Sequence, residues 1–407
     1  MRHLTFLATA SVILAADFAT LASANNGLLS FGNGPESVGA GGAAISLPQS
    51  AVNASANPAV LGHLNDEVDL SLGIFSPTRT LNPQGNLANP AFGDQTSRVD
   101  DYLDAALGFN KRLSPNWAVG FTLTPEGGGQ TKYGASYTNP AFSEEPNSNS
   151  GILIRYGILA PAAAYSPTPS QSYGISLLLG YVDARSNHAV PNGFGGLMET
   201  AGNNQDDSAL GIGVRIGALW DLGERLTIGA TASSGVFYQR LDKYRDLFRG
   251  PVDLPPEAGI GVTWHATRTT DIAVEGKFIA YNAVNAFGGA PSNGGFGWQN
   301  EPVVIIGLVQ RLGDAWTLRA GWNYGPTPIP DYNTFANALY PAISENHFTA
   351  GVSYALSQSW VISAAGYYSP KNSQTDPGTG DFYSQNGKGT TISLEQWGVQ
   401  VGLKWKY

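Results

Sequence analysis

The sequence contains no cysteine, and only 13% of its 407 residues are charged, roughly half the usual share. Without cysteine the chain has no disulfide framework, no thiolate metal site and no cysteine nucleophile. Beyond the N-terminal stretch it also lacks a run of roughly 18 or more apolar residues, which excludes a protein that crosses a membrane with helices. Basic residues are few: 22 Lys and Arg against 31 Asp and Glu give a net charge of −9, which argues against nucleic-acid binding.

The chain is instead rich in glycine and aromatic residues, with 51 Gly, 18 Tyr, 17 Phe and 9 Trp. From residue 67 on, apolar residues alternate with small or polar ones, as in the series Leu210, Ile212, Val214 and Ile216. Strict alternation predicts half-buried β-strands. We expect about 14 strands, near residues 68–78, 102–112, 116–125, 152–166, 172–184, 208–221, 225–237, 256–266, 271–283, 302–312, 316–325, 346–357, 360–369 and 391–407.

The connections between these segments alternate in length. The short ones lie around residues 113–115, 167–169, 222–224, 267–269, 313–315 and 357–359, and the long ones cover about 79–101, 126–151, 185–207, 238–255, 284–301, 326–345 and 370–390. Short turns on one side and long loops on the other are typical of an up-and-down barrel in an outer membrane. The sequence therefore predicts an all-β fold, a transmembrane antiparallel up-and-down β-barrel in the outer membrane of a Gram-negative cell.

Tryptophan placement supports the same interpretation. Six of the nine Trp lie next to the short connections or the C-terminus: Trp117, Trp220, Trp264, Trp316, Trp360 and Trp405. Their amphipathic rings favour the membrane interface, so the clustering indicates an aromatic girdle, whereas the core of a soluble sandwich would show no such preference. Each unsatisfied backbone group in hydrocarbon costs several kcal/mol, so the last strand must pair with the first. That last strand ends in Tyr407 and resembles the terminal signal that the barrel-assembly machinery recognises. We therefore expect two kinds of partner, the barrel-assembly machinery and outer-membrane lipid.

The first 66 residues do not follow the strand pattern. Residues 1–24 have the organisation of a signal peptide, since Arg2 and His3 precede an apolar stretch that ends in Ala22-Ser23-Ala24. Cleavage there would make Asn25 the first residue of the mature chain. Residues 25–66 are rich in small residues, which allow close packing against a surrounding wall. We expect them to form a plug, or hatch, in the lumen of a barrel made by residues 67–407.

Several motifs are more specific. A Gly-rich stretch over residues 38–44 is followed by Asn57-Pro58-Ala59, and residues 254–259 read Leu-Pro-Pro-Glu-Ala-Gly. Residues 319–324 read Arg-Ala-Gly-Trp-Asn-Tyr, and residues 347–351 read His-Phe-Thr-Ala-Gly. With these motifs in this order, the chain resembles the FadL family of outer-membrane long-chain fatty-acid transporters, including its TodX-type relatives for aromatic hydrocarbons. The resemblance covers nearly the whole mature chain and matches Asn57, Pro58 and Ala59 to the hatch motif.

The resemblance implies a 14-stranded barrel that takes up hydrophobic small molecules passively, as a monomer, with no cofactor. The ligand would be captured among the outer loops, bind in the lumen and leave sideways through a gap in the wall beside a kinked strand. The ligand itself, a long-chain fatty acid or a neutral aromatic hydrocarbon, stays open. Two alternatives also remain open: a general porin, and a structural or adhesin barrel.

Candidate ligand-binding residues fall into two groups. The aromatic residues Phe194, Phe237, Tyr244 and Phe248 lie in or next to long loops and are candidates for capture, although they would equally serve to pack the loops together. A short amphipathic helix is expected over residues 242–248. Alternation places four charged side chains in the lumen, where a cation could meet a carboxylate ligand: Arg215, Glu275, Lys277 and Arg319. Such charges often pair with one another, here Lys277 with Glu275.

No feature of the sequence indicates an enzyme or a metal site. There is no G-x-S-x-G motif, and His63, His188, His265 and His347 show no link to a serine and an acid, nor zinc spacing. A barrel lipase or esterase is therefore the third choice of function. Asp376 and Asp381 lie in a turn that is better explained as solvated than as a calcium site. We expect no catalytic residue and no metal ligand.

Overall fold

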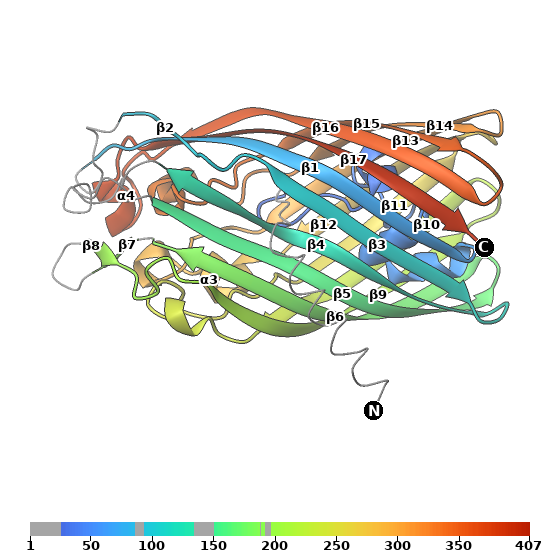
Figure 1. The fold of residues 1–407 in the computed structure, drawn as a ribbon, viewed down its shortest axis with the longest axis horizontal. Helices are drawn as coiled ribbons and strands as arrows, with labels where there is room; N and C mark the ends of the chain where they lie inside the picture. Colours follow the sequence, from blue (N-terminus) through green and yellow to red (C-terminus); the bar gives the residue numbers. More distant parts are fainter. Residues whose placement is uncertain (1–25, 86–92, 134–149, 188, 192–196) are drawn as a thin grey trace.

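The computed structural model describes residues 26–85, 93–133, 150–187, 189–191 and 197–407, which form a closed β-barrel with strands steeply tilted to its long axis (Figure 1). The predicted signal peptide, its cleavage site and Asn25 lie outside the described residues. The wall strands are β1 (Glu67–Asn82), β3 (Tyr102–Arg112), β4 (Trp117–Tyr133), β5 (Ser150–Thr168), β6 (Gln171–Ser186), β9 (Asp207–Asp221), β10 (Leu226–Tyr238), β11 (Glu257–His265), β12 (Thr270–Ile279), β13 (Glu301–Leu312), β14 (Trp316–Tyr324), β15 (Asn346–Ala355), β16 (Trp360–Thr375) and β17 (Thr391–Lys406).

Closure comes from the two ends of the wall. Each of these strands pairs antiparallel with its neighbours, and β17 pairs with β1 along the whole register from Glu67↔Lys406 to Asn82↔Thr391. The predicted closed antiparallel barrel of 14 strands is confirmed. Three short strands were not predicted: β2 (Gln95–Thr96), which pairs antiparallel with the end of β1, and the antiparallel pair of β7 (Ala189–Pro191) and β8 (Leu197–Glu199).

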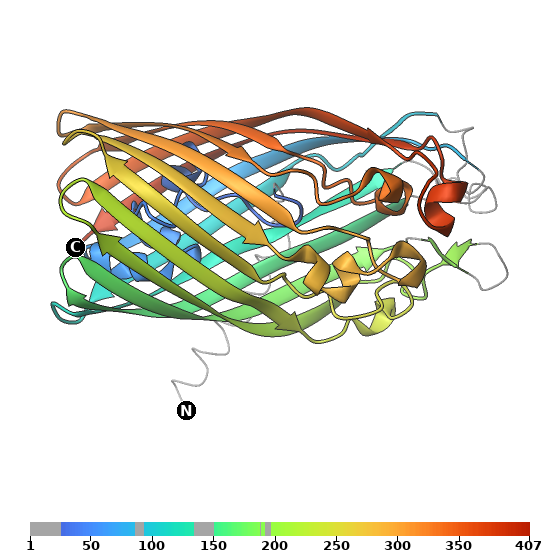
Figure 2. The ribbon, with the colours of Figure 1, turned by 180° about the vertical axis from the view of Figure 1, so that it is seen from behind.

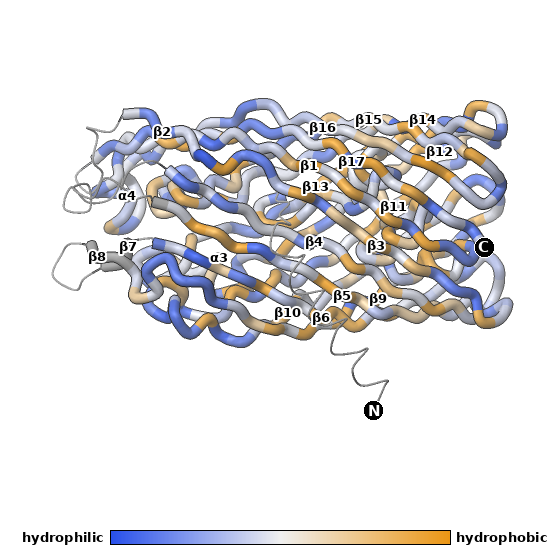
Figure 3. Tube along the Cα trace, viewed as in Figure 1, coloured by the Kyte–Doolittle hydropathy of each residue, from blue (hydrophilic) through white to orange (hydrophobic). Residues whose placement is uncertain are grey.

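The two faces of the wall differ as alternation predicts. On β12, Val274 and Phe278 face outward and are 51% and 48% exposed, whereas Glu275 between them is only 2% exposed. Apolar residues colour the middle of the barrel along most strands (Figure 3). The outer face therefore suits hydrocarbon, where backbone groups must find their partners within the protein.

The two ends of the barrel also differ. The tight turns and the C-terminus lie at one end, and the long loops lie at the other (Figure 1). Trp117, Trp264, Trp316, Trp360 and Trp405 are exposed on the outer face near the tight turns. The girdle predicted from sequence is thus present at the short-turn end, where amphipathic rings favour an interface.

The long-loop end is covered by short helical turns packed around aromatic side chains. They are η6 (Asp242–Tyr244), η7 (Tyr281–Ala283), α3 (Asn285–Gly288), η8 (Pro291–Asn293), η9 (Asp331–Asn333), η10 (Phe335–Asn337) and α4 (Phe382–Asn386). The amphipathic helix expected over residues 242–248 is wrong, because only the single 3₁₀ turn η6 forms before Arg245. In the described part of the chain, no helix is both long and apolar enough to cross a membrane.

Residues 26–66, here called the N-terminal segment, run inside the barrel. Their turns α2 (Pro35–Gly39), η2 (Ala51–Ser55) and η3 (Pro58–His63) lie within the wall toward the short-turn end, and both views show them enclosed by strands (Figures 1 and 2). Almost all residues from 26 to 61 are buried. The buried interior therefore includes the interface between the N-terminal segment and the inner face of the wall, while the largest apolar cluster continues into the long loops through residues such as Phe248, Phe287 and Trp298.

Candidate functional site

Inward-facing glycines let the N-terminal segment lie directly against the wall. A Cβ added at any of seven wall glycines would lie 3.0 Å or less from an atom of the N-terminal segment, closer than ordinary contacts allow: Gly108, Gly174, Gly217, Gly229, Gly307, Gly321 and Gly351. They come from seven different strands, β3, β6, β9, β10, β13, β14 and β15. The fit is thus backbone against backbone over much of the circumference.

Glu275 fixes the middle of the N-terminal segment. Its carboxylate accepts hydrogen bonds from the backbone N–H groups of Ala44, Ile45 and Ser46 at 2.7–3.0 Å, and from the Ser46 hydroxyl at 3.0 Å. Hydrogen bonds to a charged acceptor are worth roughly 1.5–3 kcal/mol each. Glu275 faces inward as predicted, but its expected pairing with Lys277 is wrong, because its acceptors are taken up by the N-terminal segment.

Asn57, Pro58 and Ala59 form a second attachment. The Asn57 side-chain amide donates to Ile45 O at 2.7 Å and to Ala218 O of the wall at 3.2 Å, while its Oδ1 caps η3 by accepting from Ala59 N. The Ser172 hydroxyl of β6 donates to Ala59 O at 2.7 Å. The motif therefore ties the N-terminal segment both to itself and to two wall strands.

A cluster of charges holds α2 to the wall. Lys404 Nζ of β17 lies 3.8 Å from Glu36, 3.8 Å from Glu67 and 3.6 Å from Asp69. Burial disfavours the charged form of Glu36, but Lys404 and Arg319 outweigh that cost and hold the pKa of Glu36 below its ordinary value. Glu36 therefore stays ionised inside the barrel.

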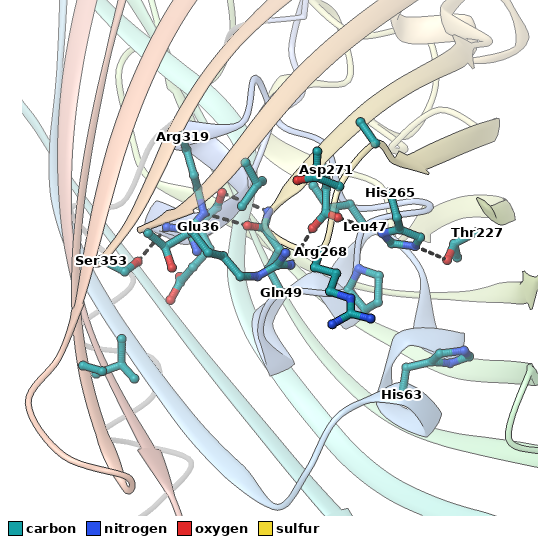
Figure 4. Close-up of a pocket in the computed structure, with 18 of the residues that line it drawn as sticks. Glu36, Leu47, Gln49, His63, Thr227, His265, Arg268, Asp271, Arg319 and Ser353 are labelled. Carbon is teal, nitrogen blue, oxygen red and sulfur yellow. Dashed lines mark hydrogen bonds and ion pairs between the residues drawn. The ribbon is translucent and has the colours of Figure 1, made fainter. Parts of the chain in front are cut away.

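Arg319 faces inward as predicted and also contacts the N-terminal segment. Its Nε donates to Gln49 Oε1 and its Nη1 donates to Ser353 Oγ, both at 2.6 Å (Figure 4). The same view shows the polar cavity that opens toward the short turns, about 1080 Å³ in volume, whose lining includes Glu36, His63 and Asp271. Arg319 is thus part of the docking interface between the N-terminal segment and β14.

The wall is not fully paired between β3 and β4. Their ladder runs only from Arg112↔Ala118 to Leu107↔Leu123, although β3 stays paired with β1 up to Tyr102. Beyond Pro125, β4 bulges at Glu126 and shifts its register against β5. We call residues 102–106 of β3 and 124–129 of β4 the unpaired stretch. A bulge bends a strand and ends pairing locally, so β4 is kinked here.

The N-terminal segment contacts this unpaired stretch from inside. Ser30 N donates to Glu126 O at 3.0 Å, and Gly128 N donates to Leu28 O at 3.1 Å. Gly128 has a φ of +118°, a conformation that side-chain-bearing residues rarely adopt. The start of the described chain thus partly satisfies the backbone groups that β3 leaves free on β4, which couples the N-terminal segment to the part of the wall where the β3–β4 ladder ends.

The Glu126 side chain reaches a buried ion cluster in the lumen. Its Oε1 lies 3.5 Å from Arg215 Nη2 on β9, and Arg215 also pairs with Glu257 of β11. Lys277 lies 3.7 Å from the same Glu257. Arg215 and Lys277 therefore face inward as predicted, but each is already paired with a carboxylate, and sequence reasoning missed Glu126 and Glu257 as their partners.

The predicted capture aromatics lie in three different settings. Tyr244 and Phe248 are buried and pack on each other, and Phe248 packs on Phe296 of a neighbouring loop. Phe237 is exposed on the outer face of β10 rather than in a loop. Phe194 lies outside the described residues. Phe248 and Phe296 line an outer cavity of about 420 Å³ that Arg240, Arg245 and Arg249 border.

The acids of the last long loop serve as caps. Asp376 accepts from Gly378 N, Phe335 N and the Ser384 hydroxyl, and Asp381 caps α4 at Tyr383 N. Among the described residues, no group of three or more His, Cys, Asp or Glu is arranged to hold a metal ion. Hydrogen bonds within this loop and from Phe335 N and Ser292 N of neighbouring loops account for these carboxylates.

Comparison with known protein families gives one match, which covers most of the chain. The model of a family described as outer membrane protein transport protein (OMPP1/FadL/TodX) matches residues 33–385. No curated protein matches the sequence.

Three solved structures share the fold over nearly their whole length. The Pseudomonas putida toluene transporter TodX is 15% identical, with a TM-score of 0.70 and coverage of 92% of this chain and 98% of the other. A Pseudomonas aeruginosa FadL homologue is 12% identical, with a TM-score of 0.68 and coverage of 93% and 99%. The Ralstonia pickettii toluene transporter TbuX is 15% identical, with a TM-score of 0.65 and coverage of 92% and 98%.

Proposed function

The chain belongs to the outer membrane protein transport family (OMPP1/FadL/TodX), and we propose that it is an outer-membrane channel for passive uptake of hydrophobic molecules. Its ligands are long-chain fatty acids or aromatic hydrocarbons, in keeping with the toluene transporters that share its fold. The proposed route has no chemical step, no cofactor and no second subunit.

The main support for the proposal is the contact between the N-terminal segment and the unpaired stretch of β3 and β4. The N-terminal segment occupies the lumen toward the short-turn end, below the loops through which a ligand would enter. This argues against a water-filled porin. The wall beside that segment lacks its ladder, so a small displacement of residues 28–30 opens a sideways path. Release there transfers an apolar molecule into the bilayer without returning it to water.

In this proposal the outer cavity beside Phe248 captures the ligand, the lumen binds it, and the N-terminal segment is the plug. Domain roles follow: residues 1–24 direct export, residues 25–66 gate, and residues 67–407 span the membrane. The barrel-assembly machinery acts on β17. Arg215, Lys277 and Arg319 set the electrostatics of the lumen and hold the plug, because acids or the N-terminal segment occupy their donors.

The experiment removes the kink. Deleting Glu126 takes out the extra residue of the bulge, so that β4 can continue its ladder with β3 past Leu123. We expect cells carrying this variant to lose most uptake of labelled oleate or toluene while the barrel still assembles, as judged by heat-dependent mobility on gels. Undiminished uptake by a correctly assembled variant would refute lateral exit at this site.

A further inference from the structure

Glu301 is a buried acid that lacks a partner. It is the first residue of β13, is fully buried, and neither of its carboxylate oxygens has a hydrogen-bond partner. Within the described residues no cation forms an ion pair with it, and Lys277, whose charge reaches it, already pairs with Glu257. A buried charge without a counter-charge costs several kcal/mol, so this acid calls for a partner that the wall does not supply.

A short loop segment separates Glu301 from the start of the N-terminal segment. A Cβ added at Gly325 would overlap Glu301 Oε1, so these two residues are in direct contact. Three residues further on, Pro328 lies against Gly27, where an added Cβ would lie 3.0 Å from Pro328 Cγ. A chain of three residues spans at most roughly 11 Å, so Glu301 and Gly27 border the same small region of the interior.

The first residue of the N-terminal segment has unsatisfied polar groups as well. Asn26 is fully buried, and neither the oxygen nor the nitrogen of its side chain has a hydrogen-bond partner. Its backbone carbonyl accepts from the Tyr281 hydroxyl at 2.6 Å. Burial, and after it the charge of Glu301, raises the pKa of Tyr281, so the acid acts on the same hydroxyl. The unsatisfied groups of Asn26 and Glu301 therefore lie in one region, and a cation with several N–H donors would satisfy both.

Removal of the signal peptide creates such a cation next to Asn26. When a signal peptidase hydrolyses the Ala24–Asn25 bond, water is added across it, which leaves a carboxylate on Ala24 and an α-ammonium group on Asn25. The ammonium group carries a positive charge and three N–H donors, whereas the same nitrogen in the precursor is a neutral amide with one. Two donors suit the two oxygens of Glu301, and the third suits Asn26 Oδ1.

We infer that Glu301 is the binding site for the amino terminus of the mature chain, so that the start of the N-terminal segment is fixed only after the signal peptide is removed. This inference rests on the export signal in the proposed function and adds a maturation step to it. In the precursor Glu301 stays unpaired in the interior. In the mature protein the new ion pair offsets the cost of burying its charge, which makes the mature barrel the more stable of the two.

The test measures how fast an amine-reactive ester labels the amino terminus of the purified mature protein in lipid nanodiscs, by mass spectrometry of the N-terminal peptide. Only an uncharged amine reacts, and the pair with Glu301 holds this amine in its charged form. We expect Glu301→Gln to be labelled about tenfold faster than wild type. One alanine inserted before Asn25 moves the amine by about 3.8 Å and should raise the rate similarly. Glu224→Gln, which removes an exposed acid from a short turn, is the matched control.

The outcomes separate the inference from the proposed function. Equal labelling rates in wild type and Glu301→Gln overturn the inference, as does wild-type labelling as fast as in the urea-unfolded chain, or a mature chain that begins at another residue than Asn25. Uptake of labelled oleate or toluene by cells that carry the same variants tests the proposed function: no uptake by wild type contradicts that function, whatever the labelling rates. The alanine insertion leaves the wall unchanged, so it decides the question if Glu301→Gln does not assemble.

Discussion

Glu36 shows how one side chain ties the N-terminal segment to the wall. It is enclosed by Lys404 and Arg319 and by the Ser363 hydroxyl, and Lys404 also faces Glu67 and Asp69. The cations stabilise the ionised form only while α2 stays docked. Docking therefore depends on the charge of Glu36, in the same way that folding stability depends on a carboxylate whose pKa is lowered.

The sign of the pH dependence follows from that lowered pKa. The contribution of Glu36 to docking is fully present above the ordinary pKa of 4.5 and is lost as pH falls below it. We expect single-channel conductance in planar bilayers to rise between pH 5 and about pH 3. Glu36→Gln should already conduct more at pH 7 and respond less to acid. A wild-type conductance that is flat over this range would contradict the account.

For the inner face of the wall, the sequence predicts which side chains point into the lumen but not which groups they bind. Alternation along β12 correctly placed Glu275 and Lys277 in the lumen, because charges on the lipid face are costly. That Glu275 binds the backbone of residues 44–46 depends on how a segment about 230 residues away is folded, and no local pattern encodes it.

At the scale of the element, strands were predicted well where alternation is strict and poorly where it breaks. β9 spans Asp207–Asp221 against an expected 208–221. β4 was expected to end at residue 125 but continues to Tyr133, because the bulge at Glu126 and the glycines after it interrupt the period of two. The residues that break the pattern, Glu126 and the glycines after it, lie in the unpaired stretch where the proposed function places ligand exit.

The inward glycines of the strands are a signal that sequence reasoning missed, and they yield a prediction. A Cβ at Gly217 would overlap Asn57 Oδ1, so Gly217→Val should displace the Asn57-Pro58-Ala59 attachment and raise conductance. In Gly276→Val the added Cβ would have no neighbour closer than 3.9 Å, which makes this variant the control. Bilayer recordings that fail to distinguish the two variants would show that docking does not depend on backbone contact with the wall.

At the scale of the whole molecule, the fold both satisfies the backbone of the wall in lipid and fills the lumen. Pairing of β1 with β17 satisfies the backbone in lipid, and the filled lumen removes the open pore that such a cylinder would otherwise leave. The ladder between β3 and β4 stops at Leu107↔Leu123, although both strands continue beyond it. The sequence could predict the cylinder from its alternating pattern and the girdle from the tryptophans beside the short connections, whereas the position of the unpaired stretch depends on how the strands pair.

The most direct test of the central claim measures hydrophobic uptake and water permeation on the same protein. In cells that lack their own channel for such compounds, the protein should increase uptake of labelled oleate or toluene several-fold. The purified barrel in liposomes should give no swelling with arabinose. Swelling at the rate of an open porin, or uptake no faster than in cells without the protein, would contradict the account.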